Sequence, residues 1–306
     1  MNAANYSNDA VTGNLSAVLM DRFYQRVFDL YKRSFSGLVS KPTYITRMSH
    51  DALDMRRSRE QVASIERTHG ISLAGKRVLE VGAGLGLTVA VARLEFGAES
   101  FGIEPSAEEY DGSLQIARDL LTTCGLPPDA IVSGVGENLP FESASFDAVI
   151  SSNVLEHVRD PAAVIRESIR VLRPGGILHF VVPNYGSWWE GHYGVLWLPH
   201  MPRWAARWYV RMLGRDPAFL DTLQFIHYGW LARIVRQHRD QVDVLGYGAE
   251  LWEQRVRTLD FAEYHALHKV KAILRVLHRM GLITLVLKLG RALHWETPLV
   301  LVLRKR

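Results

Sequence analysis

Three glycines at alternate positions, Gly82, Gly84 and Gly86, follow a short apolar run that begins at Arg77 and precede a helical pattern at 87–97. Glycine adopts the backbone conformations of a tight turn and lets a ligand lie against the bare main chain. The helix that follows directs its free N–H groups toward whatever is bound there. This order of strand, glycine-rich loop and helix predicts a cofactor-binding loop.

Two glutamates narrow the class of cofactor. Glu80 lies inside the strand, two residues before Gly82, where its carboxylate would repel a pyrophosphate but suits the ammonium group of an amino-acid-bearing ligand. The G-x-G-x-G spacing also differs from the G-x-G-x-x-G of dinucleotide-binding enzymes. Glu104, at the end of the next expected strand, is placed to accept hydrogen bonds from ribose hydroxyls. Together these features decide against a nicotinamide cofactor.

Short apolar runs alternate with helical patterns from about position 76 onward. We expect five of these runs to be strands, at 77–82, 100–104, 130–133, 146–151 and 176–182. Strands that alternate with helices imply βαβ units and a parallel sheet covered on both faces. A last apolar strand is expected at 298–304.

These patterns divide the chain into four expected segments. They are N-terminal helices over 1–69, a cofactor-binding core over 70–184, an aromatic-rich acceptor lid and helix over 185–240, and the last sheet strands with inserted basic amphipathic helices over 241–306. A lid is expected because additions at the carboxyl edge of such sheets carry substrate specificity. The tryptophans of this lid either stack on a sugar ring or apolar ring of the bound substrate, or they form a core between the lid and the sheet.

Composition and charge limit the classes of partner. The chain of 306 residues carries 36 basic and 32 acidic residues, a balance that does not favour nucleic-acid binding. Its one cysteine, Cys124, excludes an intrachain disulfide and fits a reducing compartment. We identify no signal peptide and no membrane span, and we expect a cytoplasmic protein. The basic helices at 262–293 leave open a peripheral contact with anionic lipid, with solvated helix faces as the alternative.

Four ordered motifs resemble those of class I S-adenosylmethionine-dependent methyltransferases, and more closely the branch with ubiquinone- and menaquinone-biosynthesis-type members. They are VLEVGAGLG, GIEPS, GENLPFESASFDAVISSNVLEHV and VLRPGGILHFVVPN, and they cover roughly residues 70–184. The resemblance implies an α/β fold with a doubly wound, seven-stranded, mostly parallel Rossmann-like sheet, N-terminal helices and a C-terminal helical lid insertion. It also implies an antiparallel last strand, S-adenosyl-L-methionine as the cofactor and methyl transfer as the reaction.

The resemblance assigns the cofactor contacts as well. The methionine and ribose side falls to the glycine loop, the ribose hydroxyls to Glu104 and the adenine to residues 136–138. The full expected set is Glu80, Gly82, Ala83, Gly84, Gly86, Glu104, Pro105, Gly136, Glu137, Asn138 and Asn153. One position departs from the family, because Val135 stands where an aspartate usually binds the adenine amino group. Glu137 or backbone groups would have to take over that contact.

Residues beyond the fourth and fifth strands are candidates for the acceptor site. His157 lies just past the fourth strand and is a candidate general base for a hydroxyl acceptor, with a structural loop residue as the alternative. Asn184, Tyr185 and His192 follow the fifth strand and are candidate acceptor contacts, or else packing residues. No metal site is expected.

The expected function is O-methylation of a small-molecule, glycan or lipid-linked hydroxyl by in-line methyl transfer. The sequence SSNV at 151–154 replaces the Asn-Pro-Pro-Tyr type motif of DNA-adenine and protein-glutamine N-methyltransferases. Two alternatives stay open. One is N- or C-methylation of a small metabolite or of a quinone or lipid precursor. The other is an inactive methyltransferase-like binding subunit, against which the intact glycine loop argues.

Overall fold

The computed structural model describes residues 3–35, 42–106, 112–259 and 267–306. Its elements are, in chain order, α1 (Ala3–Phe35), α2 (Pro42–Ala52), α3 (Met55–His69), β1 (Arg77–Val81), α4 (Leu87–Leu94), β2 (Glu99–Glu104), α5 (Ser113–Thr123), η2 (Pro128–Ala130), β3 (Ile131–Ser133), β4 (Phe146–Ser152), α6 (Pro161–Val171), β5 (Leu172–Val182), β6 (Trp189–Glu190), β7 (Val195–Leu196), α7 (Arg203–Met212), η3 (Ala218–Asp221), α8 (Tyr228–Arg236), β8 (Val242–Gly246), α9 (Ala249–Thr258), α10 (Leu267–Arg279), α11 (Ile283–Ala292) and β9 (Leu299–Lys305).

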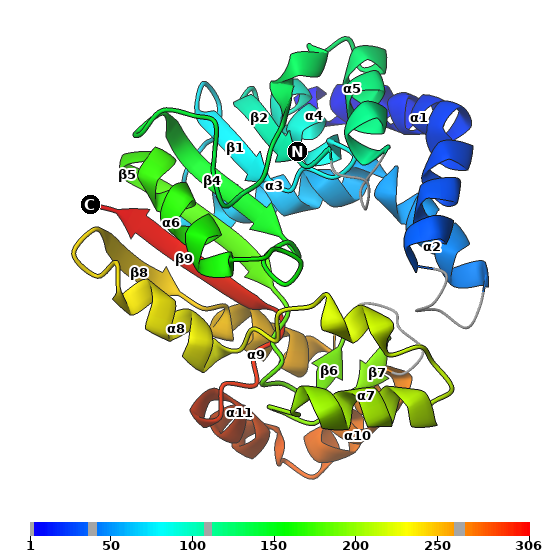
Figure 1. Ribbon diagram of the computed structural model, residues 1–306, viewed down its shortest axis with the longest axis vertical. Coiled ribbons are helices and arrows are strands. Elements are labelled where there is room, and N and C mark those ends of the chain that lie inside the picture. The colour runs from blue at the N-terminus through cyan, green and yellow to red at the C-terminus, as the bar shows by residue number, and fades with distance from the viewer. Residues whose placement is uncertain (1–2, 36–41, 107–111, 260–266) are drawn as a thin grey trace. The chain divides into compact units, whose positions relative to one another are not determined.

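Seven strands form one sheet in the order β3-β2-β1-β4-β5-β9-β8. The pairs β1–β2, β1–β4 and β2–β3 are parallel. The chain passes from β1 to β2 on one side, whereas β4 lies on the other side of β1 (Figure 1), so the direction of winding reverses between β1 and β4. In open α/β sheets, ligands bind beyond the carboxyl ends of the strands at such a reversal. The doubly wound seven-stranded fold expected from the sequence is confirmed.

The chain forms two compact units. The first contains residues 1–151 and 163–179 together with Lys305, and the second contains 152–162 and 180–304 together with Arg306. The four segments expected from the sequence are defined by motifs and composition, whereas these two units are defined by packing. The four segments stay a prediction.

In the first unit, the N-terminal helices share one hydrophobic core with the helices that flank the glycine loop. Leu19, Phe23 and Val27 recur every four residues along α1 and are buried together in this core. Arg26 of α1 also forms a 2.8 Å ion pair with Asp119 of α5. Burial of this α1 face therefore anchors the long first helix to the sheet-covering layer.

Several element boundaries differ from the expected ones for identifiable reasons. The N-terminal helices expected over 1–69 include a break before α3, because the Asp54 carboxylate accepts a hydrogen bond from the Arg56 N–H and caps that helix. Helix α5 begins at Ser113 after Gly112, which has a φ of 108°, and residues 107–111 lie outside the described residues. The fifth strand begins at Leu172 rather than at 176, since the Pro-Gly-Gly sequence that reads as a turn lies inside it.

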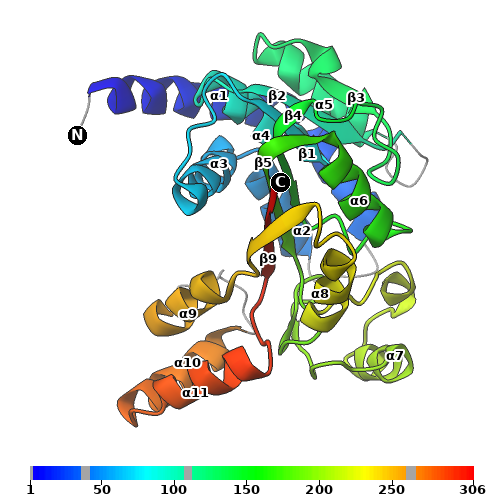
Figure 2. The same cartoon turned by 90° about the vertical axis from the view of Figure 1, so that its left-hand side faces the viewer.

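The second unit has a small core of its own. The stretch expected as basic amphipathic helices at 262–293 contains α10 and α11, with 260–266 outside the described residues. Figure 2 shows α10 and α11 side by side, and these helices pack with α9 around Trp252, Val256, Leu274, Ile283 and Leu287. Within the described ranges, no helix has the length and apolar character that crossing a bilayer requires.

Gly102 in β2 shows how closely the glycine loop packs on the sheet. A Cβ at this position would lie 2.6 Å from the Ala83 Cβ and 3.1 Å from the Val89 Cγ2. We therefore expect Gly102→Ala to lower the free energy of unfolding by about 1–3 kcal/mol through overpacking. Urea unfolding followed by circular dichroism measures this change as a lower midpoint with an unchanged slope.

The matched control is Gly246→Ala in β8, where a Cβ would meet no heavy atom within 4 Å. Its effect should stay within about 0.5 kcal/mol. Equal effects of the two substitutions would contradict close packing at Gly102.

Candidate functional site

The glycine loop between β1 and α4 has backbone angles that favour glycine. Gly82, Gly84 and Gly86 have φ values of 74°, 53° and 77°, which lie in the left-handed region. The N–H groups of Gly82 and Ala83 both donate to the Ile103 carbonyl oxygen at 3.0 Å. The loop is therefore fixed to the end of β2 by main-chain bonds.

Two of these glycines serve different purposes. A Cβ on Gly86 would lie 2.4 Å from the Ile131 Cδ1, whereas a Cβ on Gly84 would meet nothing within 4 Å. Gly86 therefore permits close packing of the loop against the neighbouring strand. Gly84 leaves open space along the main chain, as a ligand-binding loop requires.

Glu104, at the end of β2, is buried and holds the loop from the side. Its Oε2 accepts a hydrogen bond from the Gly84 N–H at 2.9 Å, and its Oε1 accepts one from the Ser113 hydroxyl at 3.1 Å. Burial raises the pKa of Glu104, and these two bonds oppose the rise. Burial and the Glu104 charge together raise the pKa of Tyr31, in α1, to about 12. The structure thus brings the loop and Glu104 together, as expected.

Glu80 in β1 is a buried carboxyl with an unused acceptor. Burial raises its pKa to about 8, while a hydrogen bond with Thr88 lowers it and the charge of Glu104 raises it further. Its Oε2 has no hydrogen-bond partner. A buried carboxylate gains most from a cation or from a charged donor. The residues present therefore fit a cofactor that carries an ammonium group, such as S-adenosylmethionine.

Residues 135–138 form the tight turn expected at the adenine. The Asn138 N–H donates to the Val135 carbonyl oxygen at 3.2 Å. Gly136 is packed against β1, since a Cβ there would lie 2.9 Å from the Val81 Cγ1. The Val135 side chain is 46% exposed, and that of Glu137 is half-buried. The adenine contacts of this turn stay a prediction.

Pro105 and Asn153 complete the expected cofactor set. Pro105 directly follows Glu104 and is half-buried. Asn153 is exposed, has a φ of 55° and donates its N–H to the Val181 carbonyl oxygen at 2.9 Å. It belongs to the second unit. Its expected contact with the methionine moiety stays a prediction.

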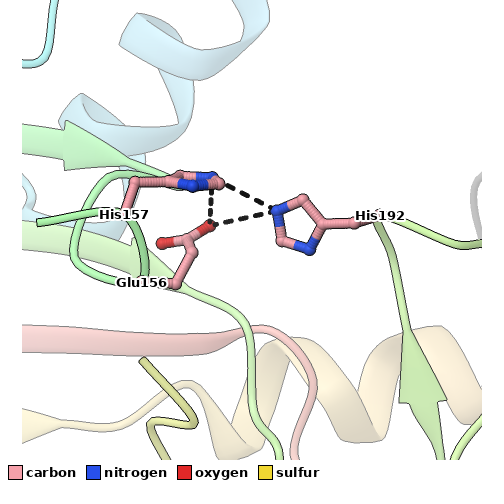
Figure 3. A group of neighbouring side chains, drawn as sticks. All are labelled: Glu156, His157 and His192. Atoms are coloured by element: carbon pink, nitrogen blue, oxygen red, sulfur yellow. Dashed lines mark hydrogen bonds and ion pairs between the residues drawn. The ribbon is translucent and has the colours of Figure 1, made fainter. Parts of the chain in front are cut away.

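Three side chains converge in the second unit, as Figure 3 shows. The Nε2 atoms of His157 and His192 lie 3.2 Å apart, and they lie 3.8 Å and 4.0 Å from the Glu156 Oε1. Glu156 is fully buried, and neither of its carboxylate oxygens has a hydrogen-bond partner. Two of the expected acceptor-site residues are thus brought together around a carboxylate.

A buried glutamate, Glu190 in β6, fixes the orientation of His192. The short antiparallel pair β6–β7 places His192 in the turn that joins these strands. The Glu190 Oε1 lies 2.7 Å from the His192 Nδ1, and its Oε2 accepts the Tyr193 N–H at 2.6 Å. Because Nδ1 is engaged with Glu190, the Nε2 of His192 is left to face His157 and Glu156.

The charges of the cluster follow from burial and from these contacts. Burial and the neighbouring His192 lower the pKa of His157 to about 4. Burial raises the pKa of Glu156 to about 7, against the opposing effect of His192. Burial lowers the pKa of His192, but its bond to Glu190 outweighs burial and raises it. A pKa of about 4 leaves His157 neutral at pH 7, and the contact of His192 Nδ1 with Glu190 raises the pKa of His192.

Asn184 and Tyr185 are held by protein groups. The Asn184 Nδ2 donates to two main-chain carbonyl oxygens in the loop before β9, at 2.9 Å and 2.6 Å. The Tyr185 hydroxyl donates to the Glu190 Oε1 at 3.3 Å, and its ring stacks on Phe225 with 4.5 Å between centroids. Tyr185 thus contacts the glutamate that orients His192, whereas Asn184 holds the loop before β9. Direct contact of either side chain with an acceptor stays a prediction.

Sequence reasoning missed Glu156 and Glu190 as site residues. A glutamate directly before His157, and another two positions before His192, were the available signals. Glutamates are mostly surface residues, so a glutamate near a histidine carries little information by itself. Only their burial distinguishes Glu156 and Glu190 from ordinary surface glutamates.

The family-model comparison concerns the central part of the chain. Residues 79–180 match the family model described as a methyltransferase domain. An uncharacterized methyltransferase of Mycobacteroides abscessus is 35% identical over 158 residues, which are 50% of this chain and 57% of that protein. A ubiquinone biosynthesis O-methyltransferase of Xanthomonas oryzae pv. oryzae is 39% identical over 115 residues, 37% of this chain and 46% of that protein.

Among solved structures, the [4+2]-cyclase SpnF is similar with a TM-score of 0.47 and 20% identity, over 84% of this chain and 82% of that one. The chain spans about half the length of the curated relatives that it matches. The matched region contains the glycine loop, Glu104 and the turn at 135–138. Residues 79–180 are therefore a methyltransferase domain, as the resemblance to class I S-adenosylmethionine-dependent methyltransferases implied.

Proposed function

We propose that the whole chain is an S-adenosylmethionine-dependent methyltransferase that methylates a hydroxyl group of a small-molecule or lipid-linked acceptor. One observation carries the cofactor part of this proposal. Glu80 is buried with an unpartnered oxygen, beside a loop whose Gly84 leaves space at the main chain. An ammonium-bearing sulfonium cofactor satisfies the carboxylate and uses the space.

The choice of a hydroxyl acceptor has two supports. A relative over the domain region is named as an O-methyltransferase of ubiquinone biosynthesis. The sequence after β4 is SSNV rather than an N-methyltransferase tetrapeptide. The sulfonium is already activated, so the enzyme must align the acceptor and accept its proton. His157 is our candidate for the proton acceptor.

A lipid surface as the source of the acceptor is supported by exposed apolar side chains in the second unit. On α7, Trp204, Trp208 and Met212 lie four residues apart and are 75%, 64% and 65% exposed. Helices α10 and α11, and the residue directly after each of them, also expose large apolar side chains, at Ile273, Val276, Met280, Leu285, Leu289 and Leu293. Amphipathic helices with tryptophan on one face and basic residues on the other bind anionic membrane surfaces.

The cofactor site is tested by titrating S-adenosylhomocysteine into the purified protein by calorimetry. We expect micromolar binding by the wild type and none by Gly84→Arg, because the new side chain fills the space at the loop. Glu104→Ala should weaken binding about tenfold to a hundredfold through loss of charged hydrogen bonds to ribose.

The matched control is Gly75→Arg, because Gly75 is exposed, has a φ of 69° and would place a Cβ in open space. The Gly75→Arg variant carries a similar backbone strain outside the glycine loop, and it should bind S-adenosylhomocysteine like the wild type. Absence of binding by the folded wild type would instead favour the inactive binding subunit.

The pH dependence of cofactor affinity reports on Glu80. With a pKa of about 8 in the ligand-free protein, its carboxyl is protonated at lower pH, whereas an ammonium ligand stabilises the ionised form. Binding therefore releases a proton, and affinity should rise with pH from about 6 to about 8, by up to about tenfold per unit. The rise ends above the pKa, where Glu80 is already ionised.

Calorimetry in buffers of different ionisation enthalpy measures the released proton directly. Glu80→Gln should abolish both the proton release and the pH dependence. It should also raise the melting temperature of the ligand-free protein above pH 8, since it removes a buried charge. A wild-type affinity that is flat across this range would contradict the assigned role of Glu80.

The membrane part is tested by co-sedimentation with vesicles. We expect binding to vesicles that contain phosphatidylglycerol and weak binding to phosphatidylcholine alone. The double substitution Trp204→Ser/Trp208→Ser should weaken binding about tenfold or more, because each large apolar side chain contributes about 1.5–3 kcal/mol when buried. Leu94→Ser is the control, since Leu94 in the first unit is 42% exposed.

The same vesicles, loaded with a lipid extract and supplied with methyl-labelled cofactor, test the acceptor. Fragmentation of the labelled product by mass spectrometry should place the methyl group on oxygen. A label on nitrogen or carbon would contradict the hydroxyl acceptor. If the protein does not bind vesicles but transfers the labelled methyl group to a water-soluble acceptor, only the membrane part of the proposal is contradicted.

A further inference from the structure

We propose that Glu156, His157 and His192 form a binding site for one divalent first-row transition-metal ion of the zinc type. The ligand atoms are the Nε2 of each histidine and a carboxylate oxygen of Glu156. These three residues are a group that could hold a metal, with all ligand atoms within 4.8 Å of one another. The site is argued from second-unit residues alone. It shares His157 with the methyl-transfer proposal, and a metal ion on the His157 Nε2 would replace the general-base role of that nitrogen.

The geometry of the three atoms matches metal coordination. Their separations are 3.2 Å, 3.8 Å and 4.0 Å, so a point equidistant from them lies about 2.1 Å from each. Zinc binds histidine nitrogen at about 2.0–2.1 Å and carboxylate oxygen at about 2.0–2.2 Å. The cluster therefore accepts an ion with little movement of its side chains.

The state of Glu156 points to a cation. Its side chain is fully buried, and neither oxygen has a hydrogen-bond partner. A buried carboxylate without donors is costly, and buried charges are generally paired or coordinate metals. The Nε2 atoms of His157 and His192 lie 3.8 Å and 4.0 Å from its Oε1, and each can donate a lone pair to the same ion.

Glu190 supplies the support that metal-bound histidines usually have. Its Oε1 lies 2.7 Å from the His192 Nδ1, while the main-chain N–H of His192 also donates to this oxygen at 3.1 Å. A carboxylate on the second ring nitrogen fixes the tautomer and makes the other nitrogen a better ligand. This arrangement holds the His192 Nε2 toward the proposed ion.

The ligand types decide the class of metal. Two imidazoles and one carboxylate suit zinc, iron, nickel or copper, whereas magnesium and calcium prefer sites made of oxygen atoms. Three protein ligands also leave a fourth position for water or for a substrate oxygen. Should the proposed O-methylation hold, that position would bind and orient the acceptor hydroxyl.

Cobalt(II) is the probe, because it replaces zinc and its visible absorption reports the coordination geometry. Untagged protein is stripped with a chelator, dialysed and titrated with Co²⁺, and Zn²⁺ is then added in competition. We expect one Co²⁺ per chain, a tetrahedral-type spectrum and its loss on addition of Zn²⁺. Glu156→Gln, His157→Ala and His192→Ala should each weaken binding at least about tenfold.

His200→Ala is the matched control, since His200 also contacts a second histidine, with 4.8 Å between its ring centroid and that of His227. It should bind Co²⁺ like the wild type. Circular dichroism separates loss of the site from loss of the fold, and Glu156→Gln keeps the size of the side chain. No stoichiometric binding by the folded wild type, or binding that survives all three ligand substitutions, would overturn the proposal. The readout does not depend on methyl transfer, so its failure and the failure of the proposed function are distinguishable.

Discussion

Burial of carboxylates is the constraint on which both candidate sites depend. A carboxylate removed from water is stabilised by fixed donors or by a cation; without them its pKa rises and it takes up a proton. Glu104 and Glu190 find donors, from a loop N–H and a serine hydroxyl in one case and from a histidine and main-chain N–H groups in the other. Glu80 and Glu156 keep unpartnered oxygens, and these are the positions for which we propose an ammonium group and a metal ion. A fifth buried glutamate, Glu296, also has an unpartnered oxygen and belongs to neither site.

In the first unit, this constraint acts through the glycine loop. Glu104 accepts the N–H of Gly84, while Ile103, the residue before it, accepts two further loop N–H groups. The loop is thereby fixed before any ligand arrives, so little conformational entropy has to be lost on binding. The loop packs closely at Gly86, and Gly102 allows β2 to pack closely against the loop. At Gly84 the main chain has open space, where we propose that the cofactor binds.

In the second unit, side-chain hydrogen bonds rather than regular secondary structure position much of the cluster of Glu156, His157 and His192. A two-residue hairpin, β6–β7, carries His192, and Glu190 organises its turn. On α7, by contrast, Trp204 and Trp208 are mostly exposed. The polar cluster and these exposed apolar side chains are the observations on which our proposal of a lipid-borne acceptor rests.

The sequence by itself determined the sheet, the glycine loop and the partnership of the loop with Glu104, because alternating apolar runs and glycine spacing encode local backbone geometry. It also singled out His157 and His192 as separate candidates. Only the tertiary structure decided that these histidines meet, since they lie 35 positions apart on segments without a regular period. It alone revealed Glu156 and Glu190, because a glutamate reads as a surface residue until its burial is known. Burial and long-range convergence are properties of packing, and no short sequence pattern encodes them.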